Sequence, residues 1–242
     1  MGSATSTHQD EWAMMNNIGG LAGVRQAAAA FASEVHPLLP GSGRVAALIA
    51  TPVTHGVAGL GIFRFGDEAY SEQIISAGYA NRLGSTSLGI KINLIQYHAA
   101  GFGYRNALSI GFGGVSEITP NIAVGAYIFN LNQPRISSGQ NERLPARLAA
   151  GAGLKLTEGV RVNVEVEKDL PFPATFKAGM EYRAYSKFFL RTGFNLQPSS
   201  GAFGLGFKNA RVRIDYATQF NSLTGIGHHV SFSYAFLKRT KG

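Results

Sequence analysis

Cysteine is absent from the 242 residues of this sequence. A chain without cysteine has no disulfide framework, no thiolate nucleophile and no cysteine-ligated zinc. This absence is compatible with a location in the cell envelope, but it does not establish one.

Charge and long apolar runs are also scarce. Charged residues make up 15% of the chain, against about 25% in a soluble domain. Apolar stretches such as VAALIA (45–50) fall far short of the roughly 18 residues of a transmembrane helix. The polar start MGSATSTHQDEW lacks the apolar core of a secretory signal, so we expect any such signal to have been removed. The composition disfavours both an ordinary soluble surface and a helical membrane protein.

The chain is basic without a basic cluster. Its formal net charge is +8, and its 22 lysines and arginines are spread along the chain, with no basic run longer than the KRTK near the end. Nucleic-acid binding is therefore disfavoured, whereas anionic lipid or an acidic protein stays open as a partner.

What the sequence does contain is a repeated alternation with a period of two, together with 31 glycines. In GVRVNVEVEKDL, valines 160, 162, 164 and 166 alternate with Arg161, Asn163, Glu165 and Glu167. In RVRIDYATQF, Val212, Ile214, Tyr216 and Thr218 alternate with Arg211, Arg213, Asp215 and Ala217. Such alternation indicates strands with one apolar and one polar face.

Turn signals divide the chain into about fourteen strands. We expect them near 25–36, 43–52, 55–65, 71–82, 85–97, 104–116, 120–131, 145–156, 159–168, 173–184, 187–197, 201–208, 211–220 and 227–237. Their mean length of about 11 residues exceeds the usual 5–6 and suits a tilted strand that crosses a bilayer. The sequence therefore predicts an all-β fold, a transmembrane antiparallel β-barrel, with apolar rows facing lipid and charged rows facing the lumen. A soluble β-sandwich, the alternative, does not explain the strand lengths or the low charge.

The whole chain resembles the PorV/PorQ-like outer-membrane proteins of Bacteroidota, which are related to FadL-type barrels. The resemblance rests on the order and spacing of NNIGGLAGV (16–24), TPNIAVGAYIFNLNQP, ERLPARLAAGAGLKL, VEVEKDLPFPATFKAGMEYR, LRTGFNLQPSSGAFGLGF and RVRIDYATQF. The chain departs from the family in having Ile18 where proline is common, and in being short. The resemblance implies fourteen strands, with an N-terminal segment at or inside one end of the barrel. We expect a plug at 1–24, a barrel at 25–238 and a periplasmic tail at 239–242.

Two groups of residues are expected inside the barrel. The lumen face should carry a cross-strand network formed by Arg147, Lys155, Arg161, Glu165, Glu167, Lys177, Glu181, Arg183, Arg191, Arg211, Arg213 and Asp215. A selective pore is the alternative interpretation of these charges. Small residues on the same face leave room for a plug formed by Trp12, Asn17, Gly19, Gly20 and Leu21, and a disordered N-terminal tail is the alternative.

No residue set predicts catalysis, a cofactor or a metal. His228 and His229 lie near Ser231 and Ser233, but no third group is placed locally to orient a general base. One histidine pair also lacks the further ligands of a closed metal site. The acidic residues Asp67, Glu68 and Glu72 suit calcium by ligand type, but acidic loop tips are ordinarily just solvated.

The expected function is therefore non-enzymatic. The resemblance implies either a binding and scaffolding subunit of a type IX secretion or gliding complex, or a FadL-like transporter of hydrophobic small molecules. We predict the scaffold, because the lumen face reads as mostly charged and glycine-rich. Expected partners are outer-membrane lipid, lipopolysaccharide and other envelope proteins. The protein contacts are predicted in the polar connection 132–145 through Arg135, Glu142 and Arg143.

Overall fold

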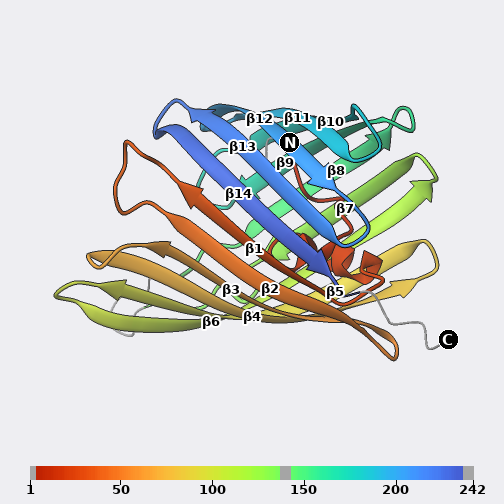
Figure 1. The fold of residues 1–242 in the computed structure, drawn as a ribbon. Helices are drawn as coiled ribbons and strands as arrows, with labels where there is room; N and C mark the ends of the chain where they lie inside the picture. The colour runs from red at the N-terminus through yellow and green to blue at the C-terminus, as the bar shows by residue number, and fades with distance from the viewer. Residues whose placement is uncertain (1–3, 137–142, 237–242) are drawn as a thin grey trace.

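The computed structural model describes residues 4–136 and 143–236. They form a closed antiparallel barrel of fourteen strands, in which each strand pairs with its sequence neighbours and β1 pairs with β14 (Figure 1). The predicted fold class is confirmed. None of the helices in the described residues is long and apolar enough to cross a membrane.

The strands closely follow the predicted ranges. They are β1 (Ala28–Val35), β2 (Arg44–Val53), β3 (Gly56–Gly66), β4 (Tyr70–Leu83), β5 (Thr86–Ala99), β6 (Gly103–Thr119), β7 (Ile122–Phe129), β8 (Arg147–Lys155), β9 (Val160–Asp169), β10 (Thr175–Arg183), β11 (Phe188–Leu196), β12 (Ser199–Lys208), β13 (Val212–Asn221) and β14 (Gly225–Ala235). Two short 3₁₀ helices precede them, η1 (Glu11–Met14) and η2 (Ile18–Gly23).

The outer face of the barrel is apolar because successive side chains of a strand point to opposite faces. In β13, Ile214 and Tyr216 are 46% and 43% exposed on the outside. Between them, Arg213 and Asp215 point into the lumen and pair with each other. An apolar outer face around a polar interior suits a barrel surrounded by lipid.

The two ends of the barrel differ. One end holds the start of β1, the end of β14 and connections such as Leu83–Thr86, and we call it the turn end. The other, the loop end, carries the longest connection, between Phe129 and Arg147. The β3–β4 and β5–β6 hairpins reach furthest at the loop end, on the left of Figure 1.

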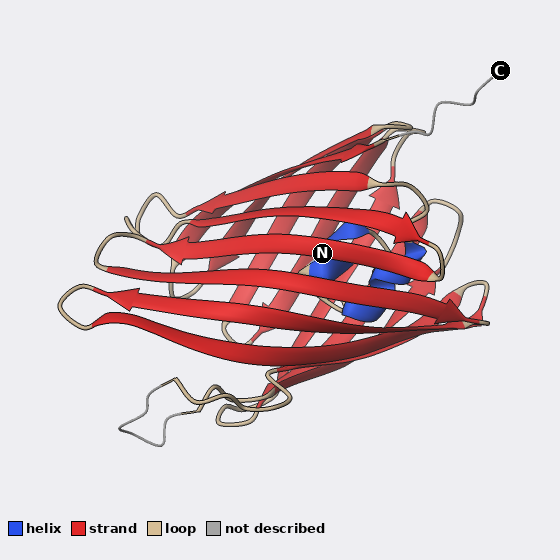
Figure 2. Ribbon diagram, turned by 90° about the horizontal axis from the view of Figure 1, so that it is seen from below, coloured by secondary structure: helices blue, strands red, loops and turns tan. Residues whose placement is uncertain are grey.

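The N-terminal segment lies inside the barrel. Figure 2 shows both short helices enclosed by the strands. Met14, Ile18 and Leu21 are at most 1% exposed and pack with residues of β1–β4, including Leu48 and Ala80. We call residues 4–24 the plug.

Candidate functional site: the plugged lumen

The plug is fitted to one wall of the barrel by apolar packing and by glycines. η2 lies against β4, β5 and β6. A side chain at Gly89 would come within 2.8 Å of the Ile18 carbonyl oxygen, and one at Gly113 would collide with Asn17 Oδ1. Asn17 Nδ2 donates to the Gly114 carbonyl at 2.8 Å. The missing side chains on the lumen face therefore allow the plug backbone to approach the wall.

A buried lysine adds one polar contact on this side. Lys91, only 5% exposed, donates from Nζ to the Met14 carbonyl at 3.2 Å. The same ammonium lies 4.2 Å from the centroid of the Phe129 ring, a cation–π geometry. Lys91 thus links the end of η1 to β5 and β7.

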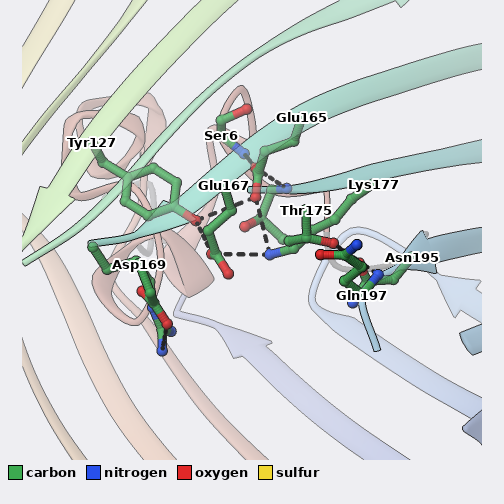
Figure 3. A network of polar contacts seen from close by, with 11 residues as sticks. Ser6, Tyr127, Glu165, Glu167, Asp169, Thr175, Lys177, Asn195 and Gln197 are labelled. Carbon is green, nitrogen blue, oxygen red and sulfur yellow. Dashed lines mark hydrogen bonds and ion pairs between the residues drawn. The ribbon is translucent and has the colours of Figure 1, made fainter. Parts of the chain in front are cut away.

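The opposite wall holds the start of the plug through a buried carboxylate. Glu165 of β9 is 1% exposed, and its Oε2 accepts the backbone N–H groups of Thr5 and Ser6 at 2.9 and 2.8 Å. Its Oε1 lies 3.3 Å from both Lys177 Nζ and Tyr127 Oη (Figure 3). Lys177 also pairs with Glu167 at 2.9 Å. These contacts give the buried carboxylate hydrogen-bond donors and part of a counter-charge, and they satisfy two plug amides.

A second ion-pair chain reaches the plug through Asp10. Arg213 of β13 bonds Asp10 Oδ2 at 3.0 Å and Asp215 at 2.8 Å. Arg191 continues the chain by pairing with both Asp215 and Glu181. Burial alone would raise the pKa of Asp10. The attraction of the Arg213 guanidinium, together with the smaller effects of His8 and of the hydrogen bonds from Arg213 and the Trp12 N–H, outweighs burial and holds that pKa below its usual range.

Asp10 also caps η1, since its Oδ1 accepts the Trp12 N–H at 3.1 Å. Burial lowers the pKa of the neighbouring His8, which keeps that ring neutral near pH 7. The Nε2 atom of His8 lies 3.3 Å from the Asn163 amide of β9.

The remaining predicted lumen charges lie nearer the rims. Arg147 pairs with Asp169 at the loop end, whereas Lys155 pairs with Glu158 at the turn end. Arg183 donates to the Glu158 carbonyl, and Arg161 lines a cavity beside the plug. The prediction that Arg211 belongs to the lumen network is not met. Arg211 is exposed in the turn between β12 and β13, because β13 begins only at Val212.

The predicted partner loop is only partly described. Arg135 and Arg143 face each other in an isolated antiparallel bridge within the β7–β8 connection. Glu142 lies outside the described residues. The predicted tail 239–242 lies outside them as well.

The two adjacent histidines point to opposite faces. His228 bonds the Tyr216 hydroxyl at 2.8 Å on the outer face. His229 lies in the lumen beside Glu34 of β1, whose carboxylate also approaches His36 and Arg44. Sequence reasoning missed Glu34, because only the β1–β14 pairing brings it to His229. Among the described residues, no group of three or more potential ligands is arranged to hold a metal.

The acidic tip between β3 and β4 is a capped turn. Asp67 Oδ1 accepts the N–H groups of Ala69 and Tyr70 at 2.8 and 3.1 Å. These two hydrogen bonds lower the pKa of Asp67. Its carboxylate therefore stabilises the local turn.

A cavity of about 420 Å³ remains between the plug and the wall formed by β12–β14, β1 and β2. Trp12 forms part of its lining, and its indole N–H donates to Ser233 of β14 at 3.2 Å. Small side chains such as Ala32, Ala202 and Ala217 line the wall opposite the plug. The plug therefore does not fill the whole lumen.

An apolar cluster lies at the loop end, on the inner side of β4–β6. Ile95 and Ala107 are 4% and 5% exposed, and they pack against Leu144 of the β7–β8 connection. Ile74, Tyr97 and Ile136 extend the cluster. Sequence reasoning missed these lumen-facing apolar side chains, because it assigned the apolar residues of these strands to the lipid face.

Beside this cluster, the pairing between β6 and β7 is incomplete. β7 pairs with β6 only from Phe112 onward, although β6 begins at Gly103. Asn132 replaces the missing strand locally, with hydrogen bonds to Leu108 and Ile110. Nearer to Gly103, β6 has no strand partner on this side in the described part of the chain.

No protein-family model matches the chain, and neither does any curated protein sequence. Solved structures do match. The toluene transporter TbuX of Ralstonia pickettii has a TM-score of 0.78 at 12% identity, with 98% of this chain and 97% of that chain covered. The toluene transporter TodX of Pseudomonas putida has a TM-score of 0.75 at 12% identity, with 98% and 96% covered. The monoaromatic hydrocarbon channel CymD has a TM-score of 0.67 at 13% identity, with 93% of each chain covered.

At this identity the likeness establishes a shared fold. By their printed descriptions, the matched proteins are transporters and a channel. They lend no support to the PorV/PorQ branch, to type IX secretion or to an origin in Bacteroidota.

Proposed function

We propose that this chain is an outer-membrane channel for small hydrophobic molecules. The observation that carries the proposal is the apolar cluster around Ile95. It lies beside the stretch of β6 that pairs with β5 but, among the described residues, has no strand partner on the β7 side. A hydrophobic molecule gains free energy on such a surface by leaving water. The likeness to toluene transporters and a hydrocarbon channel supports the same assignment.

The lumen contains a second possible binding site for a hydrophobic molecule, the cavity beside Trp12. The cavity beside Trp12 combines an aromatic side chain with small wall residues. Residues 5–10 of the plug are held to the barrel wall by hydrogen bonds and an ion pair. Water can replace these contacts when the plug moves. We therefore place the route from the loop-end cluster past the plug to the turn end.

Uptake measurements test the cluster. We expect proteoliposomes with the native protein to take up labelled toluene faster than empty vesicles, and Ile95→Asn to reduce this uptake several-fold. The control is Gln96→Asn, which leaves Asn on the next residue and the opposite face without exchanging an apolar side chain for a polar one. Uptake no faster than in empty vesicles would reject the channel, and a stable co-purifying envelope protein would then favour the scaffold.

A disulfide lock tests the role of the plug. A Cβ at Gly153 would lie 3.3 Å from Thr7 Cβ, close to the spacing of about 3.5–4.5 Å in disulfides. Because the chain has no cysteine, Thr7→Cys with Gly153→Cys introduces the sole pair. We expect oxidation to stop uptake and reduction to restore it, while Thr7→Cys alone is unaffected by oxidant. Unchanged uptake through the locked barrel would exclude a route that needs plug movement.

A further inference from the structure

The wall formed by β3–β6 reverses its polarity near the loop end. In one cross-strand row, Ile62, Ile75, Leu94 and Leu108 point outward. The adjacent row of inward residues is Gly61, Ser76, Asn93 and Ser109, so the wall here is apolar outside and polar or small inside.

One step nearer the loop end, the order is inverted. The outward row is Arg64, Gln73, Gln96 and Asn106, and the inward row is Phe63, Ile74, Ile95 and Ala107. Ile95 and Ala107 are buried, and Ile74 packs against them, which fixes the direction of their polar neighbours. The wall here is polar outside and apolar inside.

This inversion locates the edge of the lipid. An apolar outer row is stable against acyl chains, whereas amides and a guanidinium require partners that form hydrogen bonds. The hydrocarbon therefore ends between the Leu94 row and the Gln96 row. Above that level, the β3–β4 and β5–β6 hairpins project beyond the hydrocarbon, as their reach in Figure 1 suggests.

The row beyond the amides adds aromatic groups at the same face. Ser71, His98 and Tyr104 follow one another across β4, β5 and β6. The His98 and Tyr104 rings lie 4.5 Å apart, and Tyr104 is 70% exposed. Aromatic rings at this height are typical of the girdles of outer-membrane barrels.

We infer that this face binds the phosphorylated sugar headgroup of lipopolysaccharide. We call the face, formed by Arg64, Gln73, Gln96, Asn106, His98 and Tyr104, the headgroup face. Arg64 matches a phosphate in charge and in geometry. The three amides can donate to and accept from sugar hydroxyls, and the exposed Tyr104 ring can pack on a sugar ring.

Continuity with the lipid-facing surface selects this occupant. The Ile75–Leu94–Leu108 row lies directly below the headgroup face, so one molecule with acyl chains and a sugar phosphate headgroup contacts both. The inference requires only that the barrel lies in an outer membrane. It does not depend on what passes through the lumen.

The test uses the full-length barrel in detergent, with purified lipopolysaccharide as the probe. Binding is quantified by native mass spectrometry and by titration. We expect Arg64→Ala to weaken binding about tenfold, the loss expected for a charge-assisted hydrogen bond. Gln96→Ala should weaken it less, and the double variant more than either.

The matched control is Arg105→Ala. Arg105 is on the same hairpin, next to Asn106, but on the face that points inward. Arg105→Ala removes the same formal charge as Arg64→Ala, and it should leave lipopolysaccharide binding unchanged. Equal loss in both arginine variants, or no loss in either, would overturn the inference. Equally strong competition by phosphatidylglycerol would also overturn it, because a bare phosphate would then account for binding.

Discussion

Glu165 is the residue on which the contacts at the start of the plug converge. It is 1% exposed and serves the Thr5 and Ser6 amides, Lys177 and Tyr127. We expect Glu165→Ala to destabilise the folded barrel by about 2–5 kcal/mol, because it leaves two plug amides and a buried ammonium with fewer partners. Denaturant titration in lipid vesicles measures this loss.

The control is Glu158→Ala, which removes a carboxylate from an exposed turn. It should leave the unfolding midpoint unchanged. If Glu165→Ala were as stable as Glu158→Ala, the plug would not depend on the buried carboxylate. Protease cleavage near Thr5 should increase in Glu165→Ala alone.

For single residues, the sequence predicted which face of the barrel wall a side chain points to, but not which residues it contacts. Alternation placed Glu165 and Lys177 on the lumen face, where the structure has them. Nothing local indicates that the partners of Glu165 are Thr5 and Ser6, about 160 positions earlier. Such pairs depend on how the barrel closes, and they are invisible to a period of two.

At the scale of the elements, the plug fits against the barrel wall because glycines on the lumen face leave space for its backbone. A side chain at Gly125 of β7 would collide with the Ser6 carbonyl oxygen. We expect Gly125→Leu to displace the start of the plug and to increase the conductance of single barrels in planar bilayers. Gly201→Leu is the control, because open space surrounds Gly201 on β12. Identical conductance in both variants would show that the plug keeps its place without this fit.

The strands were predictable because lipid enforces a long, regular alternation. The predicted strand 187–197 matches β11 at Phe188–Leu196 within one residue at each end. The inward direction of Ile74 and Ile95 was not predictable in the same way. Alternation separates two faces without saying which solvent each face meets, and the assignment reverses where the wall leaves the hydrocarbon.

For the whole molecule, the polarity reversal predicts how mutations depend on depth. Ile90 and Gln96 lie on the same outer face of β5, on opposite sides of the inferred hydrocarbon edge. We expect Ile90→Arg to cost roughly 2–4 kcal/mol of folding free energy in bilayers, and Gln96→Arg roughly 0–1 kcal/mol. Equilibrium unfolding in phosphatidylcholine vesicles measures both costs. Equal costs would place Gln96 within the hydrocarbon and remove the basis for the headgroup face.

The plug also crosses the joint at which the barrel closes. Trp12 bonds Ser233 of β14, while Met14 and Leu21 pack with Ala30 of β1 and Leu48 of β2. β14 is the final strand of the sheet and β1 the first, so these contacts tether the two free edges of the unclosed sheet to one short peptide. Such a tether raises the effective concentration of one edge at the other and lowers the entropic cost of joining them. We therefore expect the segment that obstructs the finished lumen also to assist the closure of the barrel around it.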